Sequence, residues 1–269
     1  MGGRPQSPVM VVMVRAARKA ARALARDFGE VDALQVSRKG PSDFVTIADV
    51  KAEQILMAEL SQARPHYGFV TEEKNVVEGA DKSHRWFIDP IDGTTNFLHA
   101  IPHYAISIGL EREGTLAAGV IYNPSRDELF WAERGIGAFL NDKRLRVSAR
   151  RDLKDCVLAT GIPFHGRPGH EEFLADLPPL MGQVAGIRRF GSAALDLAYV
   201  AAGRFDGFWE RGLKSWDMAA GIVLVREAGG EVTGIGSDDP LETGGILASN
   251  GLIHSALSGI LTGLTGRKP

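Results

Sequence analysis

The stretch "WFIDPIDGTTNFLH" (residues 86–99) places two aspartates beside a glycine turn. Asp89 and Asp92 are three positions apart, and Gly-Thr-Thr-Asn follows at once. The run 84–88, which ends in Trp-Phe-Ile, predicts a strand that ends at Asp89. Asp, Pro and Gly also favour turns by themselves, so a capped turn is a sufficient structural explanation. The alternative is that a rigid strand end holds two carboxylates for a chemical purpose.

Two further acidic positions lie at junctions between predicted elements. Glu72 and Glu73 follow the strand-like run 66–70, and Asp217 opens the helical run 215–230. Taken singly, the glutamates fit a solvated loop, and Asp217 fits a first-turn acid that complements the helix dipole. Carboxylates brought together would repel one another and take up protons unless a cation binds between them. Oxygen ligands without nearby His or Cys favour Mg²⁺, with Mn²⁺ or Ca²⁺ as alternatives.

The residues after Asp92 add a possible anion site. Gly93 allows close approach of the backbone to a ligand. The N–H groups of residues 93–95, if they open a helix, would bind an anion. Carboxylates for a metal beside N–H groups for an anion indicate a phosphate-ester site. Two such metals, roughly 3.5–4 Å apart, can activate a water and stabilise the leaving oxygen.

The composition is that of a soluble globular protein. The chain has 269 residues, of which 44% are hydrophobic and 24% charged, and its formal net charge is -2. We expect one domain over 1–269 with two structural halves, 1–145 and 146–269. The charge favours neither nucleic acid nor an acidic membrane as the main partner. The excess of Lys and Arg in residues 1–40 is interpreted as the solvated face of a helix.

The apolar run 9–14 is too short to span a membrane, and no cleavage-site pattern follows it. The single cysteine, Cys156, cannot form an internal disulfide and lies in a strand-like run. We expect a buried thiol rather than a nucleophile, in a reducing compartment. The expected location is the cytoplasm.

The order of the predicted elements favours a layered α+β architecture. An amphipathic helix is predicted over 9–27, and a second follows cap-type residues Thr46 and Asp49. Strand-like runs separated by turns indicate an antiparallel meander over 103–140. In the second half, strands are predicted at 155–161, 187–190, 205–210, 231–235 and 245–250, and helices at 169–183, 191–203, 215–230 and from about 251.

Two long motifs carry a family resemblance. "WFIDPIDGTTNF" and "SWDMAAGIVLVREAGG" resemble the two signatures of the inositol monophosphatase family, within the lithium-sensitive, Mg²⁺-dependent phosphatases. Shorter matches occur in family order over 42–53, 71–73, 188–203 and 208–217, so the resemblance runs from about residue 10 to 265. It implies an αβαβα sandwich, usually a homodimer, with two or three Mg²⁺ ions per site and inhibition by Li⁺. Mn²⁺ is a possible substitute.

The resemblance also implies roles for individual residues. The metal ligands would be the following: Glu72, Asp89, Asp92, Asp217 and the carbonyl of Ile91. Thr94 and Glu72 would hold the attacking water, with Asp49 behind them to orient Thr94 or to help a third, weaker metal. The substrate would contact Asp92, Gly93, Thr94, Gly191, Ser192, Ala193 and Glu210.

The expected activity is hydrolysis of inositol 1-phosphate by direct attack of a metal-activated water, without a phosphorylated side chain. Fructose 1,6-bisphosphate, histidinol phosphate and 3′-phosphoadenosine 5′-phosphate remain alternative substrates. Arg167, His165 and Lys214 are candidates for contacts to an additional phosphate or a nucleotide, although a surface position is the better explanation of Lys214. Thr71 departs from the family pattern, in which Gly usually precedes the two glutamates, so a different loop shape is expected there.

Two rival functions differ in class. Haloacid-dehalogenase-type phosphatases also use an aspartate cluster, but their Asp-x-Asp-Gly-Thr motif has its acids two apart rather than three. A non-catalytic role as a partner of the transcription machinery is the second rival. An intact acid set and no basic nucleic-acid patch favour the enzyme.

Overall fold

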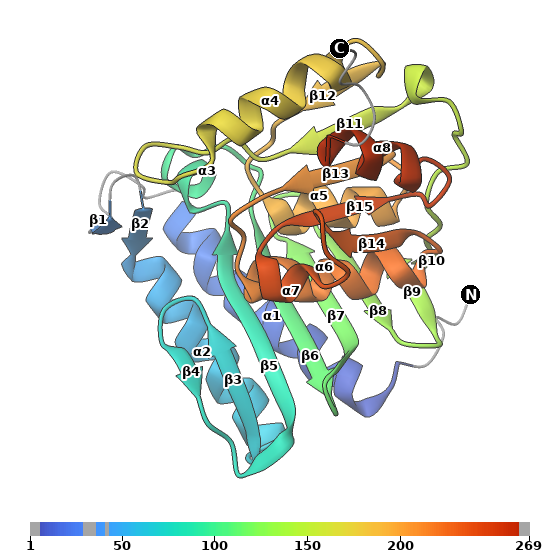
Figure 1. Cartoon of the computed structure of the whole chain (residues 1–269). Helices are drawn as coiled ribbons and strands as arrows, with labels where there is room; N and C mark the ends of the chain where they lie inside the picture. Colours follow the sequence, from blue (N-terminus) through green and yellow to red (C-terminus); the bar gives the residue numbers. More distant parts are fainter. Residues whose placement is uncertain (1–5, 29–35, 41–42, 264–269) are drawn as a thin grey trace.

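The computed structural model describes residues 6–28, 36–40 and 43–263, and the side chains of 6–28 and 47–263 (Figure 1). The expected capping by Thr46 lies outside the described side chains. The first half contains α1 (Pro8–Asp27), β1 (Val36–Gly40), β2 (Asp43–Thr46), α2 (Ile47–Ala63), β3 (Tyr67–Thr71), β4 (Asn75–Val77), β5 (Asp81–Asp92), α3 (Thr94–Leu98), β6 (Ala105–Arg112), β7 (Thr115–Asn123), β8 (Glu128–Glu133), β9 (Gly137–Leu140) and β10 (Lys143–Arg144).

The second half contains η2 (Leu153–Asp155), β11 (Val157–Thr160), α4 (His170–Met181), β12 (Gly186–Arg188), α5 (Ala193–Ala201), β13 (Gly207–Glu210), α6 (Ser215–Glu227), β14 (Glu231–Gly234), α7 (Pro240–Thr243), β15 (Ile246–Ser249) and α8 (His254–Leu261). The predicted helices and strands of this half are all present, with ends that differ by a few residues. The final helix begins at His254 rather than near residue 251.

Two large sheets and three layers of helices build the fold, and β1 and β2 form a separate two-stranded sheet (Figure 1). The larger sheet has the strand order β10-β9-β8-β7-β6-β5-β3-β4, and the smaller has the order β12-β11-β13-β15-β14. Helices α1 and α2 cover one face of the larger sheet, α5 and α6 lie between the sheets, and α4 and α8 cover the outer face of the smaller one. The αβαβα sandwich expected from the sequence is confirmed.

The layering explains why β6 is buried along almost its whole length, on both faces. One face meets α1 and the other meets α6, so both sets of alternating side chains are buried, Ser107 and Glu111 included. Strands β5 to β9 pair antiparallel with their neighbours in sequence, as predicted for the meander. The basic side chains of α1, Arg15, Arg18, Lys19, Arg22 and Arg26, lie on its exposed face.

Helix α6 packs unusually close to the larger sheet because two strands offer glycines beneath it. A Cβ atom at Gly109 of β6 would lie 2.8 Å from the Cβ of Ala219. At Gly119 of β7 it would lie 2.5 Å from the carbonyl oxygen of Ala220. This packing positions the first turn of α6 relative to the end of β5, where the acidic residues meet.

Strand β5 differs from the sequence prediction because it continues past Asp89 to Asp92. Its pairing with β6 contains an irregularity: Asp89 lies opposite Ser107, but Asp92 lies opposite Ala105. Three steps on β5 therefore match two steps on β6, which is a β-bulge. Pro90, which has no N–H to donate, falls inside the bulge and beyond the end of the neighbouring strand β3.

Candidate active site

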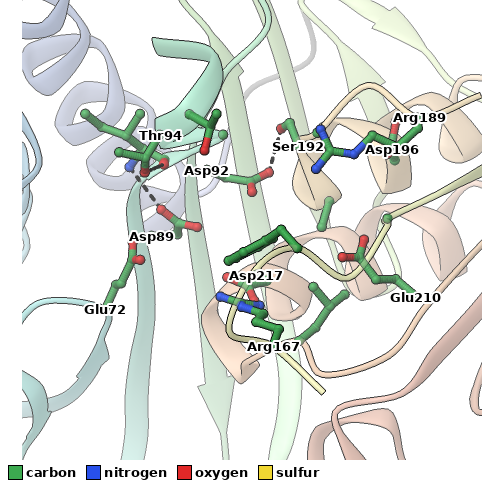
Figure 2. A pocket seen from close by; sticks show the side chains of 18 residues that line it. Glu72, Asp89, Asp92, Thr94, Arg167, Arg189, Ser192, Asp196, Glu210 and Asp217 are labelled. Carbon is green, nitrogen blue, oxygen red and sulfur yellow. Dashed lines mark hydrogen bonds between the residues drawn. The ribbon is translucent and has the colours of Figure 1, made fainter. Parts of the chain in front are cut away.

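A pocket of about 140 Å³ lies where the carboxyl end of β5 meets the edge of the second half (Figure 2). Its walls come from segments that are far apart in the sequence. The lining residues are Glu72, Asp89, Ile91, Asp92, Gly93, Thr94, Thr95, Gly161, Phe164, Arg167, Arg189, Gly191, Ser192, Ala193, Asp196, Glu210, Leu213 and Asp217.

The bulge in β5 explains how both aspartates face this pocket. In a regular strand, residues three apart point to opposite faces. The additional residue between Asp89 and Asp92 reverses that alternation, and both carboxyl groups line the pocket. Asp89 also accepts a hydrogen bond from the N–H of Ile91 at 2.9 Å. The capped turn and the functional cluster are therefore one and the same feature.

Gly93 connects the strand to helix α3 with φ of 95°. A side chain there would be strained, and its Cβ would lie 3.1 Å from the carbonyl oxygen of Gly191 and 3.2 Å from that of His103. The glycine thus lets the loop before α5 approach the start of α3. It brings backbone of the two halves of the chain together at the pocket.

Thr94 lies at the centre of a second set of contacts. Its hydroxyl lies 3.0 Å from the carbonyl oxygen of Ile91 and 3.4 Å from Oδ1 of Asp49. Asp49, Glu72 and Glu73 also bring carboxylate oxygens within 4.8 Å of one another. Asp49 itself is buried in α2 and does not line the pocket, but it lies directly behind Thr94.

The loop that carries Glu72 is held by a buried glutamate that sequence reasoning did not select. Glu53 of α2 is fully buried, and its Oε2 accepts the N–H of Glu73 at 2.9 Å. Burial raises the pKa of Glu53. Thr71 is also buried, and its hydroxyl accepts the N–H of Lys74 at 3.2 Å. These bonds account for the shape of the loop with Thr71 in place of the usual glycine.

One acid joins the halves of the chain, and another caps a helix at the pocket. Asp92 Oδ2 accepts hydrogen bonds from the Ser192 hydroxyl at 2.5 Å and the Ala194 N–H at 2.7 Å, at the first turn of α5 (Figure 2). Asp217 Oδ2 accepts the N–H of Lys214 at 2.7 Å, at the start of α6. Asp217 therefore caps its helix and lines the pocket at once, so its structural and functional interpretations are compatible.

Burial, followed by mutual repulsion, raises the pKa values of the clustered aspartates. Burial, followed by the carboxylates of Glu72 and Asp92, raises the pKa of Asp89 well above its usual value. Burial and the nearby Asp217 raise the pKa of Asp92 to about 7. Burial raises the pKa of Asp217 to about 6, against the hydrogen bond from Lys214.

In the described part of the chain, no Lys or Arg forms an ion pair with Asp89, Asp92 or Asp217. Clustered carboxylates of this kind are stable in their ionised form when a cation binds between them. Their ligand atoms are all oxygens, which suits a hard divalent cation such as Mg²⁺. The donor set therefore fits the expected metal.

Opposite the aspartates, Glu210 at the end of β13 faces the pocket. Burial, followed by the charge of Asp217, raises its pKa to about 8. Its carboxylate lies where a Cβ atom at residue 161 would be, and Gly161 leaves that space free. Gly161 is thus needed for the position of Glu210.

The structure brings together every site residue expected from the sequence. All of them line the pocket except Asp49, which contacts Thr94 from behind. Of the candidates for further contacts, Arg167 lines the pocket, and His165 and Lys214 are not among its described lining residues. Sequence reasoning did not select Gly161, Phe164, Arg189, Asp196 or Leu213. A charged residue within the apolar run of α5 was the available signal for Asp196.

The comparison with protein families decides the assignment. The model of the inositol monophosphatase family matches residues 5–264. The chain belongs to the inositol monophosphatase family. The prediction of a phosphatase is thereby confirmed for the family, and the haloacid-dehalogenase-type alternative is excluded.

Individual members of the inositol monophosphatase family are closely similar to the chain. The inositol-1-monophosphatase of Mesorhizobium japonicum is 59% identical over 94% of this chain and 95% of its own length. The Nus factor SuhB of Escherichia coli is 46% identical over 93% and 94%. The crystal structure of extragenic suppressor protein suhB from Bartonella henselae superposes with a TM-score of 0.92, at 60% identity, covering 95% of this chain and 98% of that one.

The family is metal-dependent, in agreement with the acidic cluster. No helix among the described residues has the length and apolar character needed to cross a membrane.

Proposed function

We propose that the protein hydrolyses inositol 1-phosphate to inositol and phosphate, with Mg²⁺ as cofactor. The observation that carries the proposal is the convergence of Glu72, Asp89, Asp92 and Asp217 on one pocket beside the first turn of α3. The close relationship to an inositol-1-monophosphatase supports the choice of substrate.

The carboxylates of Glu72, Asp89, Asp92 and Asp217, with the Ile91 carbonyl, would hold the metal ions, two or three in number. Bound Mg²⁺ supplies Lewis acidity, which lowers the pKa of a water and neutralises charge on the leaving oxygen. The Ile91 carbonyl accepts a hydrogen bond from the Thr94 hydroxyl, so its second lone pair would be the one available to a metal.

Thr94 and Glu72 would orient the attacking water. The Thr94 hydroxyl directs its proton to the Ile91 carbonyl or to Asp49, which leaves its oxygen lone pairs to accept a proton from water. Glu72 faces the same volume from the loop after β3 and would accept the other water proton. Asp49 would act through Thr94, as the group that fixes the direction of its hydroxyl.

The phosphate and the alcohol would bind at different walls. The backbone N–H groups of Gly93 and Thr94, at the start of α3, would bind phosphate oxygens. The carboxylate of Glu210 would accept hydrogen bonds from hydroxyl groups of the alcohol. The backbone of 191–193, which contacts Asp92 through Ser192, would line the same end.

Phosphate release from a panel of esters tests the substrate. The panel contains inositol 1-phosphate, fructose 1,6-bisphosphate, histidinol phosphate and 3′-phosphoadenosine 5′-phosphate, each with Mg²⁺, with Mn²⁺, with a chelator and with Li⁺. We expect inositol 1-phosphate to have the highest kcat/KM, loss of activity on chelation, and inhibition by Li⁺. A higher kcat/KM for a bisphosphate would instead assign Arg167 and Arg189, which line the pocket, to a second anionic group.

Direct attack by water has its own test. After a single turnover in heavy-oxygen water, all of the label should be in the released phosphate. Label in an aspartate side chain would contradict direct attack, because it would reveal a phosphorylated carboxylate that is later hydrolysed.

A binding role with the transcription machinery is the second candidate, favoured by the 46% identity to a protein named Nus factor SuhB. Co-purification with RNA polymerase of the same organism tests it. Because catalysis and binding would use different surfaces, the inactive Asp92→Asn variant should bind polymerase as well as the wild type does. Absence of binding by both proteins would remove this candidate.

A homodimer, a single domain over 1–269 and a cytoplasmic location stay predictions. The mass of the protein in solution by light scattering tests the homodimer. A single cooperative unfolding transition is expected for one domain.

A further inference from the structure

The pocket has a second polar end, on the side away from Glu72 and Asp89. Arg189, Asp196 and Glu210 lie there, from the loop after β12, from α5 and from β13 (Figure 2). The proposed function uses Glu210 at this end. Asp196 is the other acid of this group.

Asp196 is an exception within its own helix. All residues of α5 are buried, and Asp196 is the only charged one among them, with 1% of its surface exposed. Its Oδ1 has no hydrogen-bond partner among the described residues, although the side chain lines the pocket. A buried polar group without a partner is destabilising, so a carboxyl at this position requires an explanation.

The surroundings of Asp196 are suited to a ligand with hydroxyl groups. Burial, followed by the charges of Glu210 and Asp92, raises the pKa of Asp196 well above its usual value, while Arg189 opposes the increase. A protonated carboxyl can both donate and accept a hydrogen bond. A hydroxyl group can satisfy both requirements, whereas an apolar group can satisfy neither.

We propose that Asp196 is a specificity-determining residue, which forms with Glu210 the part of the pocket that recognises hydroxyl groups of the alcohol. This inference rests on the proposed function, since it assigns the alcohol of the same phosphate ester to this end of the pocket. The ligand class is a polyhydroxylated alcohol esterified with phosphate. Esters whose alcohol has no free hydroxyl would not use Asp196.

Two substitutions and two esters test the inference. Asp196→Ala removes the carboxyl group, and Asp196→Asn keeps a group of the same shape that still donates and accepts. We expect Asp196→Ala to lower kcat/KM for inositol 1-phosphate by about tenfold or more. Its kcat/KM for phenyl phosphate, which has no hydroxyl group, should stay within about twofold of wild type. Asp196→Asn should restore most of the activity on inositol 1-phosphate.

Calorimetric titration of each variant with the two esters, with Ca²⁺ in place of Mg²⁺, gives a readout that does not depend on turnover. The affinity for inositol 1-phosphate should fall in Asp196→Ala, and the affinity for phenyl phosphate should not. Asp176→Asn is the control, because Asp176 is also buried but pairs with Arg211 outside the pocket. Any change that Asp176→Asn causes should be equal in the affinities for the two esters.

The outcomes separate the inference from the proposed function. A wild-type protein that prefers another polyhydroxylated ester contradicts the proposed substrate, and the same comparison is then made with that ester. If Asp196→Ala lowered kcat/KM and affinity equally for both esters, Asp196 would have a structural role and the inference would be overturned. Unchanged kinetics and binding would also overturn it, as would an Asp196→Asn variant as impaired as Asp196→Ala.

Discussion

The carboxylate of Glu210 lies in the space that a side chain at Gly161 would require. A Cβ atom at Gly161 would be 1.9 Å from Cδ of Glu210, far inside any permitted contact. Gly161 directly follows β11, and Glu210 is the last residue of the neighbouring parallel strand β13, where Thr160 lies opposite Trp209. The glycine after one strand thus determines where the acid at the end of the next strand can lie.

Gly161→Ala is predicted to impair substrate binding without unfolding the protein. Displacement of the Glu210 carboxylate should lower kcat/KM for inositol 1-phosphate by about tenfold to a hundredfold, because small misplacements in an active site are costly. Steady-state kinetics and thermal unfolding measure the two effects. Gly182→Ala is the control, since φ there is -76° and the nearest atom to a new Cβ is 3.8 Å away. Unchanged kinetics in Gly161→Ala would remove Glu210 from the substrate site.

Asp92→Asn and Asp217→Asn are each predicted to lower turnover to less than about a tenth of wild type at saturating Mg²⁺, because each removes the charge of a proposed metal ligand. The amide keeps the shape of the side chain, so circular dichroism should be unchanged. Asp152→Asn, at a carboxylate with 67% of its side chain exposed, should have wild-type activity. If either variant kept more than a tenth of wild-type turnover, the substituted aspartate would no longer be assigned as a metal ligand.

The stability of the metal-free protein is predicted to fall as the pH rises from 5 to 8. The folded-state pKa values of Asp92, about 7, and Asp217, about 6, exceed their ordinary value of 3.8. For each aspartate, at a pH between its unfolded-state and folded-state pKa values, the folded state binds more protons than the unfolded state. The free energy of unfolding therefore decreases as the pH rises. We expect the Tm to decrease by at least about 3 °C in a chelating buffer.

Mg²⁺ should reduce this dependence on pH, because a bound cation stabilises the ionised form, and should raise the Tm at pH 8. Asp92→Asn lacks one of the titrating groups, so its Tm without metal should vary less with pH. An increase in the Tm of the wild-type protein between pH 5 and 8 in a chelating buffer would contradict the raised pKa values of Asp92 and Asp217.

Thr94→Val is predicted to lower kcat by about a hundredfold or more, because the water loses a group that orients it. Valine has the same shape, so packing next to Asp49 is preserved. Thr94→Ser keeps the hydroxyl and should retain most of the activity. Equal activities of the valine and serine variants would exclude the hydroxyl from catalysis. Single-turnover kinetics separate this effect from product release.

The amino-acid sequence alone was sufficient for most of the longer elements, for the layered fold class and for Glu72, Asp89, Asp92 and Asp217 of the acid cluster. Long apolar-periodic runs such as 215–230 predict their structure because burial of one face dominates the local energetics. The motifs around Asp92 and Asp217 were distinctive enough to indicate the family. They did not require knowledge of distances.

The tertiary structure decided what periodicity cannot express. The bulge that turns Asp89 and Asp92 to one side depends on pairing with β6, which a strict alternation along the strand does not predict. The contact between Gly161 and Glu210, and the unpartnered oxygen of Asp196, involve residues distant in the chain. Such features follow from the packing of separate elements, because only packing determines which groups lose water and which remain without a partner.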